Sequence, residues 1–140
     1  MTYQEAIKHD AYTSLPKLGK GDVTFLWYSD FWDGPKSGMA LYQGRKYWFQ
    51  LFQESQHPDL SDFYRRFLLI DLSDEQLSEE ERWHALFQEK VGRHMDFGTN
   101  QRDEINRLKP PTVQEEFYSR YKQRKPMQID DNTVVAWFES

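Results

Sequence analysis

Apolar residues in the first half of the chain follow patterns typical of β-strands. The segment 22–32 is rich in β-branched and aromatic residues, and both of its alternating faces are largely apolar. Gly and Pro within residues 33–38 predict a turn after it, and the Gln43-Gly44 pair suits a tight hairpin. These patterns predict a meander with strands over residues 22–32, 39–42, 45–54 and 63–72, the last of which could also form a helix.

Helical spacing appears at the N-terminus and in the second half of the chain. Three pairs of residues have the spacing of a capping box, in which the two side chains bond to each other's backbone: Thr2 with Glu5, Ser73 with Gln76 and Thr112 with Glu115. The apolar positions that follow predict helices over residues 3–12, 74–91 and 113–123, the second ending at Gly92. Residues 133–139 predict a last strand.

The order of these elements predicts the fold class. Strands followed by helices and a final strand are typical of an α+β domain, here an antiparallel β-meander of about four to five strands with about two to three helices packed on it. A chain of 140 residues has the size of one domain. We therefore expect residues 1–140 to form a single domain.

Composition narrows the class of protein. The chain has no Cys, which excludes a disulfide scaffold, a Cys nucleophile and a Cys-based metal site. It has no apolar stretch of about 18 residues, and its N-terminal residues lack the basic and apolar regions of a signal peptide. Its Gly residues form neither a P-loop nor a dinucleotide fingerprint. We expect a cytoplasmic protein with no membrane contact, no cofactor and no metal.

The formal net charge of −5 bears on the partner. Non-specific binding to nucleic acid needs a positive field, so nucleic acid is not an expected partner. The basic run 120–125, interleaved with Tyr118 and Tyr121, could stack on bases, or it could complement the dipole at a helix C-terminus. We favour the second interpretation, and an acidic surface favours a basic partner.

Aromatic residues concentrate in the meander, where ten lie between Phe25 and Phe52. Loops held on a rigid sheet often carry binding groups, and a carboxylate beside an aromatic face can hold a cation. The predicted ligand- or partner-binding residues are Tyr28, Asp30, Trp32, Asp33, Lys36, Ser37 and Trp48. The alternative is that Asp33 caps the turn and that the rings, Trp27 included, belong to the core.

The run from Trp27 to Phe49 resembles a hairpin of small uncharacterised bacterial proteins. The features that carry the resemblance are Asp-Gly-Pro at 33–35, Ser-Gly at 37–38, and Gly-Arg at 44–45. The resemblance implies a bacterial cytoplasmic protein. It supplies no activity and therefore no catalytic residue.

A second candidate pair is Glu80 with His84, four residues apart on the predicted helix 74–91 and therefore neighbours. A carboxylate and an imidazole could form half of a metal site or an acid/base pair, or simply a satisfied His beside a solvated Glu. Glu81 and His84 have the spacing of carboxylate-bridged bundles, but that chemistry needs a second copy of the motif, which the chain lacks. No Gly-x-Ser-x-Gly elbow accompanies the remaining residues His9, His57 and His94.

These observations predict a non-catalytic binding or protein-interaction module. Its rings would anchor a protein or small-ligand partner, and its carboxylates would fix the orientation. An immunity- or antitoxin-like role is one form of it, by analogy. The alternative is a small-molecule enzyme that uses Asp30 or Asp33 as a base, with Glu80 and His84 from the helix. Homodimerisation through the same aromatic, Asp-containing surface is a third interpretation.

Overall fold

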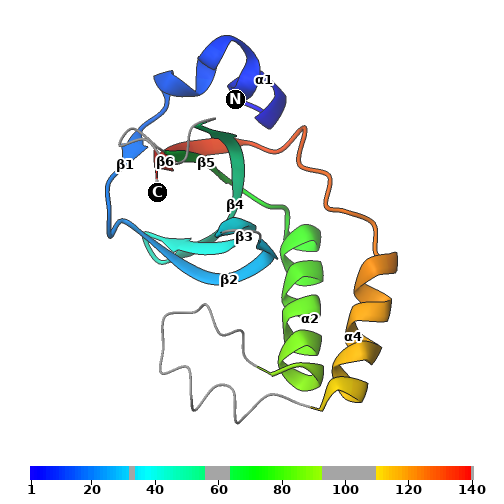
Figure 1. Ribbon diagram of the computed structural model, residues 1–140. Coiled ribbons are helices and arrows are strands. Elements are labelled where there is room, and N and C mark those ends of the chain that lie inside the picture. The colour runs from blue at the N-terminus through cyan, green and yellow to red at the C-terminus, as the bar shows by residue number, and fades with distance from the viewer. Residues whose placement is uncertain (32–33, 56–63, 93–109, 140) are drawn as a thin grey trace. The chain divides into compact units, whose positions relative to one another are not determined.

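The computed structural model describes residues 1–31, 34–55, 64–92 and 110–139 (Figure 1). The chain divides into two compact units: one comprises Met1–Leu72 with Gln128–Ser140, and the other comprises Ser73–Met127. The first holds a β-sheet and the second holds helices, so the predicted α+β class is confirmed. That residues 1–140 act as a single domain stays a prediction.

Six strands form one mixed sheet in the order β1-β6-β5-β4-β3-β2. They are β1 (Lys17–Leu18), β2 (Val23–Phe31), β3 (Pro35–Tyr42), β4 (Arg45–Glu54), β5 (Arg65–Ile70) and β6 (Val134–Glu139). Strands β2 to β5 form the predicted antiparallel meander, and β6 pairs antiparallel with β5. The predicted count of four to five strands was wrong, because the two-residue β1 pairs parallel with β6 and is too short to show a periodic pattern.

The second strand of the meander begins earlier than its composition predicted. Residues 35–38 have turn-forming composition, but they pair with β2, where Ser37 lies opposite Asp30 and Gly38 opposite Tyr28. Pairing across the hairpin therefore outweighs the local preference for a turn. Gly38 permits the close approach, since a Cβ at this position would lie 2.1 Å from the carbonyl oxygen of Trp27.

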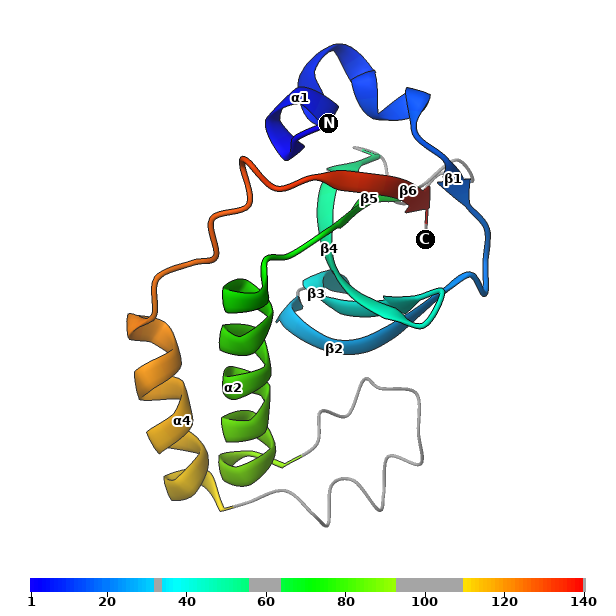
Figure 2. The ribbon, with the colours of Figure 1, turned by 180° about the vertical axis from the view of Figure 1, so that it is seen from behind.

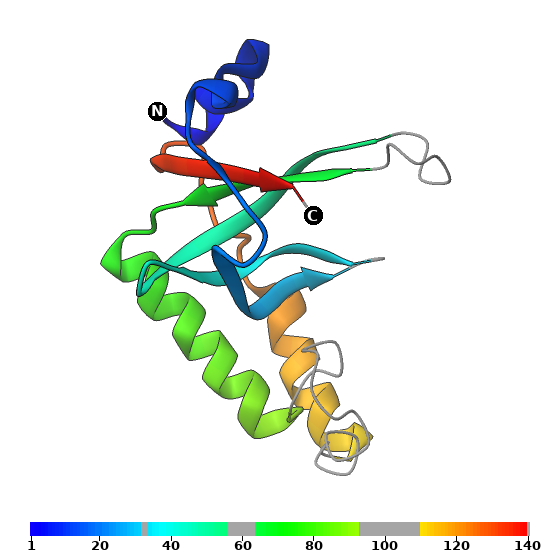
Figure 3. The same cartoon turned by 90° about the vertical axis from the view of Figure 1, so that its left-hand side faces the viewer.

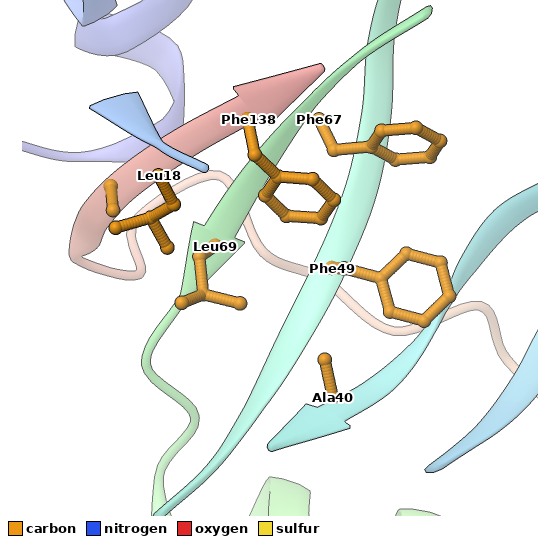
Figure 4. Close-up of a cluster of buried hydrophobic side chains, with 7 residues drawn as sticks. Leu18, Ala40, Phe49, Phe67, Leu69 and Phe138 are labelled. Carbon is orange, nitrogen blue, oxygen red and sulfur yellow. The ribbon is translucent and has the colours of Figure 1, made fainter. Parts of the chain in front are cut away.

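The core of the sheet unit lies inside a strong curl of the sheet, which Figure 3 shows with β2 and β3 (blue to cyan) facing β5 and β6 (green and red). Phe25 of β2 and Phe138 of β6 have ring centroids 6.1 Å apart, although β3, β4 and β5 separate the two strands in the sheet. The buried residues of this cluster are Leu18, Ala40, Phe49, Phe67, Leu69, Ala136 and Phe138 (Figure 4). Burial of these rings provides much of the apolar area that stabilises the sheet.

The N-terminal segment consists of α1 (Tyr3–Ile7) and the 3₁₀ helix η1 (Lys8–Ser14). The capping box of Thr2 and Glu5 is confirmed. The helix expected over residues 3–12 is broken, because His9 and Asp10 adopt left-handed conformations with φ of 50° and 56°.

The helical unit contains α2 (Asp74–Lys90) and α4 (Pro111–Gln123). The capping box of Ser73 and Gln76 is confirmed, and α2 ends before Gly92, which has a φ of 109°. The box predicted at Thr112 was wrong. Pro110 is the N-cap of α4 and Pro111 its first residue, a position that needs no N–H donor.

Aromatic side chains join the two helices. The rings of Trp83 and Tyr121 have centroids 5.6 Å apart, and Phe87 and Phe117 are separated by the same distance. Among the described helices, none is long and apolar enough to cross a membrane.

Candidate functional site

The end of the β2–β3 hairpin brings several of the predicted site residues together. Asp30 is exposed at the end of β2 and lies opposite Ser37, which is only 7% exposed. Lys36 is half-buried on the same strand as Ser37. Trp32 and Asp33 lie outside the described residues.

Two predicted aromatic members of the site, Trp48 and Tyr28, lie within the described strands of the sheet. Trp48 is 4% exposed, lies between Met39 and Ile70 on the neighbouring strands, and donates its indole N–H to Oε1 of Gln50 at 3.1 Å. Tyr28 is half-buried and makes an edge contact with Phe49. None of the described rings between Phe25 and Phe52 is exposed. For these rings the structure shows the core placement that the sequence left open as the alternative.

The sequence did not predict a role for Arg65, a charged residue that bonds to both β4 and β3 at this end of the sheet. Arg65 is 8% exposed, donates Nε–H to Oε2 of Glu54 at 3.2 Å and donates Nη1–H to the carbonyl oxygen of Pro35 at 3.3 Å. A buried guanidinium requires such partners, because an unpaired buried charge is strongly destabilising. Arg65 thereby links β5 to the β2–β3 hairpin.

Gly34 lies against this guanidinium. Its φ is 120°, and a Cβ there would lie 2.3 Å from Nη1 of Arg65. The Asp-Gly-Pro sequence at 33–35 therefore leaves room for a guanidinium as well as permitting a turn. The signal for Arg65 in the sequence is a cation near the start of a predominantly apolar strand. Its position opposite Glu54 follows from the register of β4 and β5.

A second polar cluster lies on the sheet beside the N-terminal segment. Arg66 donates Nε–H to Oε1 of Glu139 at 3.1 Å, and it donates Nη1–H to the Tyr12 hydroxyl at 2.8 Å and to Oε1 of Gln53 at 3.2 Å. Burial opposes the charge of Arg66, but its hydrogen bonds and charge interactions with Tyr12 and Glu139 together outweigh burial and raise its guanidinium pKa. The cluster therefore holds a permanent cation against the aromatic residue Trp137, 5.7 Å from the ring centroid.

Glu80 of α2 is only 2% exposed, so the interpretation of Glu80 as a solvated carboxylate was wrong. Its Oε1 lies 3.9 Å from Nη1 of Arg124, whose guanidinium sits over the ring of Tyr121 at 4.0 Å. His84 stacks on Phe87 at a centroid separation of 6.4 Å. The basic run at the end of α4 thus supplies a counter-ion to a buried carboxylate, a role that its sequence position alone did not reveal.

The chemistry of the hairpin end is that of recognition by hydrogen bonds and charge. It presents the exposed carboxylate of Asp30 beside the half-buried Lys36, with the buried Ser37 opposite Asp30 and with Arg65 bonded to Pro35 of the hairpin. Within the described part of the chain, no group of three or more His, Asp or Glu residues could hold a metal ion. Comparison with protein-family models, curated proteins and solved structures finds no match for this chain.

Proposed function

We propose that this protein is a non-catalytic binding module that recognises another protein through the end of its β2–β3 hairpin. The observation that carries the proposal is the exposed Asp30, which is paired across the hairpin with Ser37 on a frame that Arg65 holds in place. Rigid presentation lowers the entropy cost of binding, because the contacting groups are already ordered.

The burial of the rings changes which atoms would make the contact. Trp48 is buried and Tyr28 and Lys36 are half-buried, whereas Asp30 is exposed. In this proposal the aromatic residues contribute rigidity and the carboxylate contributes orientation. Trp32 and Asp33 remain proposed members of the site.

The proposed partner is a basic protein. The chain carries a net charge of −5, and complementary charge accelerates association and disfavours acidic competitors. A bacterial cytoplasmic protein with an immunity- or antitoxin-like role fits this description, and the resemblance of residues 27–49 to bacterial hairpins agrees with it.

Site-specific photo-crosslinking tests the proposal. A photoreactive amino acid replaces Asp30 in one version of the full chain and Thr24 in another, since both residues are exposed on β2 but lie toward its opposite ends. In cells that naturally make the protein, we expect a discrete crosslinked partner from position 30 and none from position 24.

Binding by purified proteins completes the test. We expect Asp30→Lys to weaken binding of that partner by about tenfold or more, because it reverses a charge at the contact, and Thr24→Lys to leave it nearly unchanged. Equal crosslinking from both positions, or equal binding by both variants, would reject the hairpin end as the recognition site.

A further inference from the structure

The N-terminal segment, residues 1–15, is attached to the sheet unit near its two ends. At its start, the N–H of Tyr3 donates to the carbonyl oxygen of Asn132 at 3.0 Å, and the N–H of Val134 donates to that of Met1 at 2.8 Å. At its far end, the attachment is the side chain of Tyr12. Figure 2 shows the segment beside β6.

The side chain of Tyr12 covers aromatic residues of the sheet. It is 1% exposed, and its ring meets Phe52 edge-on at 4.7 Å and Trp137 at 5.1 Å. Its hydroxyl donates to Oε1 of Gln53 at 3.1 Å and accepts from Nη1 of Arg66 at 2.8 Å. These contacts close the segment over the sheet.

Two features of the attached N-terminal segment cost free energy and therefore favour its detachment from the sheet. The consecutive exposed residues His9 and Asp10 are both left-handed, a conformation that costs energy for residues with a Cβ. The indole N–H of Trp137 is buried and finds no acceptor among the described residues. An unsatisfied buried donor is costly, and water would satisfy it if the cover were removed.

The chain is attached to the sheet again directly beyond the segment. The N–H of Trp137 donates to the carbonyl oxygen of Pro16 at 3.1 Å, and Lys17 and Leu18 then pair with β6. These are backbone contacts within the sheet and do not involve Tyr12. Movement of the segment can therefore end at Pro16 while the sheet stays intact.

We propose that residues 1–15 form a strap that opens as one unit about Pro16 and exposes the rings of Phe52 and Trp137. Opening relaxes His9 and Asp10, hydrates the Trp137 indole and leaves Arg66 bonded to Glu139. The open state presents aromatic rings beside a paired charge, on residues other than those of the hairpin end. The strap is independent of the proposed function.

Hydrogen exchange on the full-length protein tests the strap. The reporters are the bonded amides of Tyr3 and Ala6 in the strap and those of Leu68 and Leu69 in β5. In the unmodified protein we expect the strap amides to exchange together and faster than the β5 amides, because local opening needs less free energy than global unfolding.

The Tyr12→Phe substitution distinguishes local opening of the strap from a loss of global stability. It keeps the ring and removes the hydroxyl bonds, so we expect strap exchange about tenfold faster, equivalent to about 1.4 kcal/mol, with β5 exchange unchanged. The control is Tyr47→Phe, which removes a hydroxyl from β4 outside the strap and should leave strap exchange unaltered. Strap amides that exchange only at the β5 rate, or a Tyr12→Phe effect that is equal in both segments, would overturn the proposal.

Discussion

At the scale of single residues, the absence of a side chain at Gly38 allows β2 and β3 to approach closely. A Cβ at this position would lie 2.1 Å from the carbonyl oxygen of Trp27 and 2.9 Å from Cα of Tyr28, and both are backbone atoms that cannot rotate away. We expect Gly38→Ala to lower the free energy of unfolding by about 3 kcal/mol or more, as measured by urea denaturation.

The matched control is Gly19→Ala. A Cβ at Gly19 would meet only Oδ2 of Asp22, at an ordinary contact distance of 3.5 Å. The expected change is within about 0.5 kcal/mol, as for most surface substitutions. Similar losses in the two variants would show that close packing at Gly38 does not set the stability of the hairpin.

The same hairpin shows which site residues local sequence could reveal. Asp30 and Ser37 could be placed near one another because Gly and Pro predict a turn between two strand-forming segments. Arg65 could not be placed near these residues from the sequence, because its contact with Pro35 joins residues 30 positions apart and depends on the register of β4 with β5. The sequence left the burial of Trp48 open as an alternative, since both faces of the meander are apolar and periodicity does not say which face is covered.

At the scale of elements, the start of α2 depends on Ser73. Its hydroxyl accepts from the N–H of Gln76 at 3.2 Å, and Oε1 of Gln76 accepts from the N–H of Ser73 at 2.9 Å. We expect Ser73→Ala to lower the free energy of unfolding by about 1 kcal/mol, measured by thermal denaturation followed by circular dichroism.

Ser78→Ala is the control for this substitution. Ser78 is exposed within α2, where Ala is the better helix former, so a small gain in stability is expected. If both substitutions had the same effect, the change would reflect helix propensity and not the loss of a cap.

Elements were predictable where a local pattern decides them. The segment 45–54 matches β4, and the spacing of apolar residues identified α2 and α4 within a few positions. The local pattern did not predict elements whose formation depends on another part of the chain. Strand β1 exists only through pairing with β6, and the capping box at Thr112 is replaced by a start at Pro110 and Pro111.

At the scale of the whole molecule, the chain leaves the sheet unit after Leu72 and returns to it at Gln128. Beside the exit, the N–H of Asp71 donates to the carbonyl oxygen of Thr133, just before β6, at 2.9 Å. Strand β6 then pairs with both β1 and β5 and contributes Phe138 to the core. The sheet unit therefore needs its last strand, whereas the described members of the aromatic cluster inside the curl all belong to the sheet unit.

This arrangement makes the predicted single domain testable. A chain in which residues 73–127 are replaced by a flexible linker of about six Gly and Ser residues shortens the loop between β5 and β6 and lowers its closure entropy. We expect it to keep dispersed amide resonances for β4 and β5 and to unfold cooperatively, whereas a chain ending at residue 133 loses β6 and should not fold. If the linker chain is also unfolded, the core inside the curl is insufficient by itself and residues 1–140 behave as one cooperative domain.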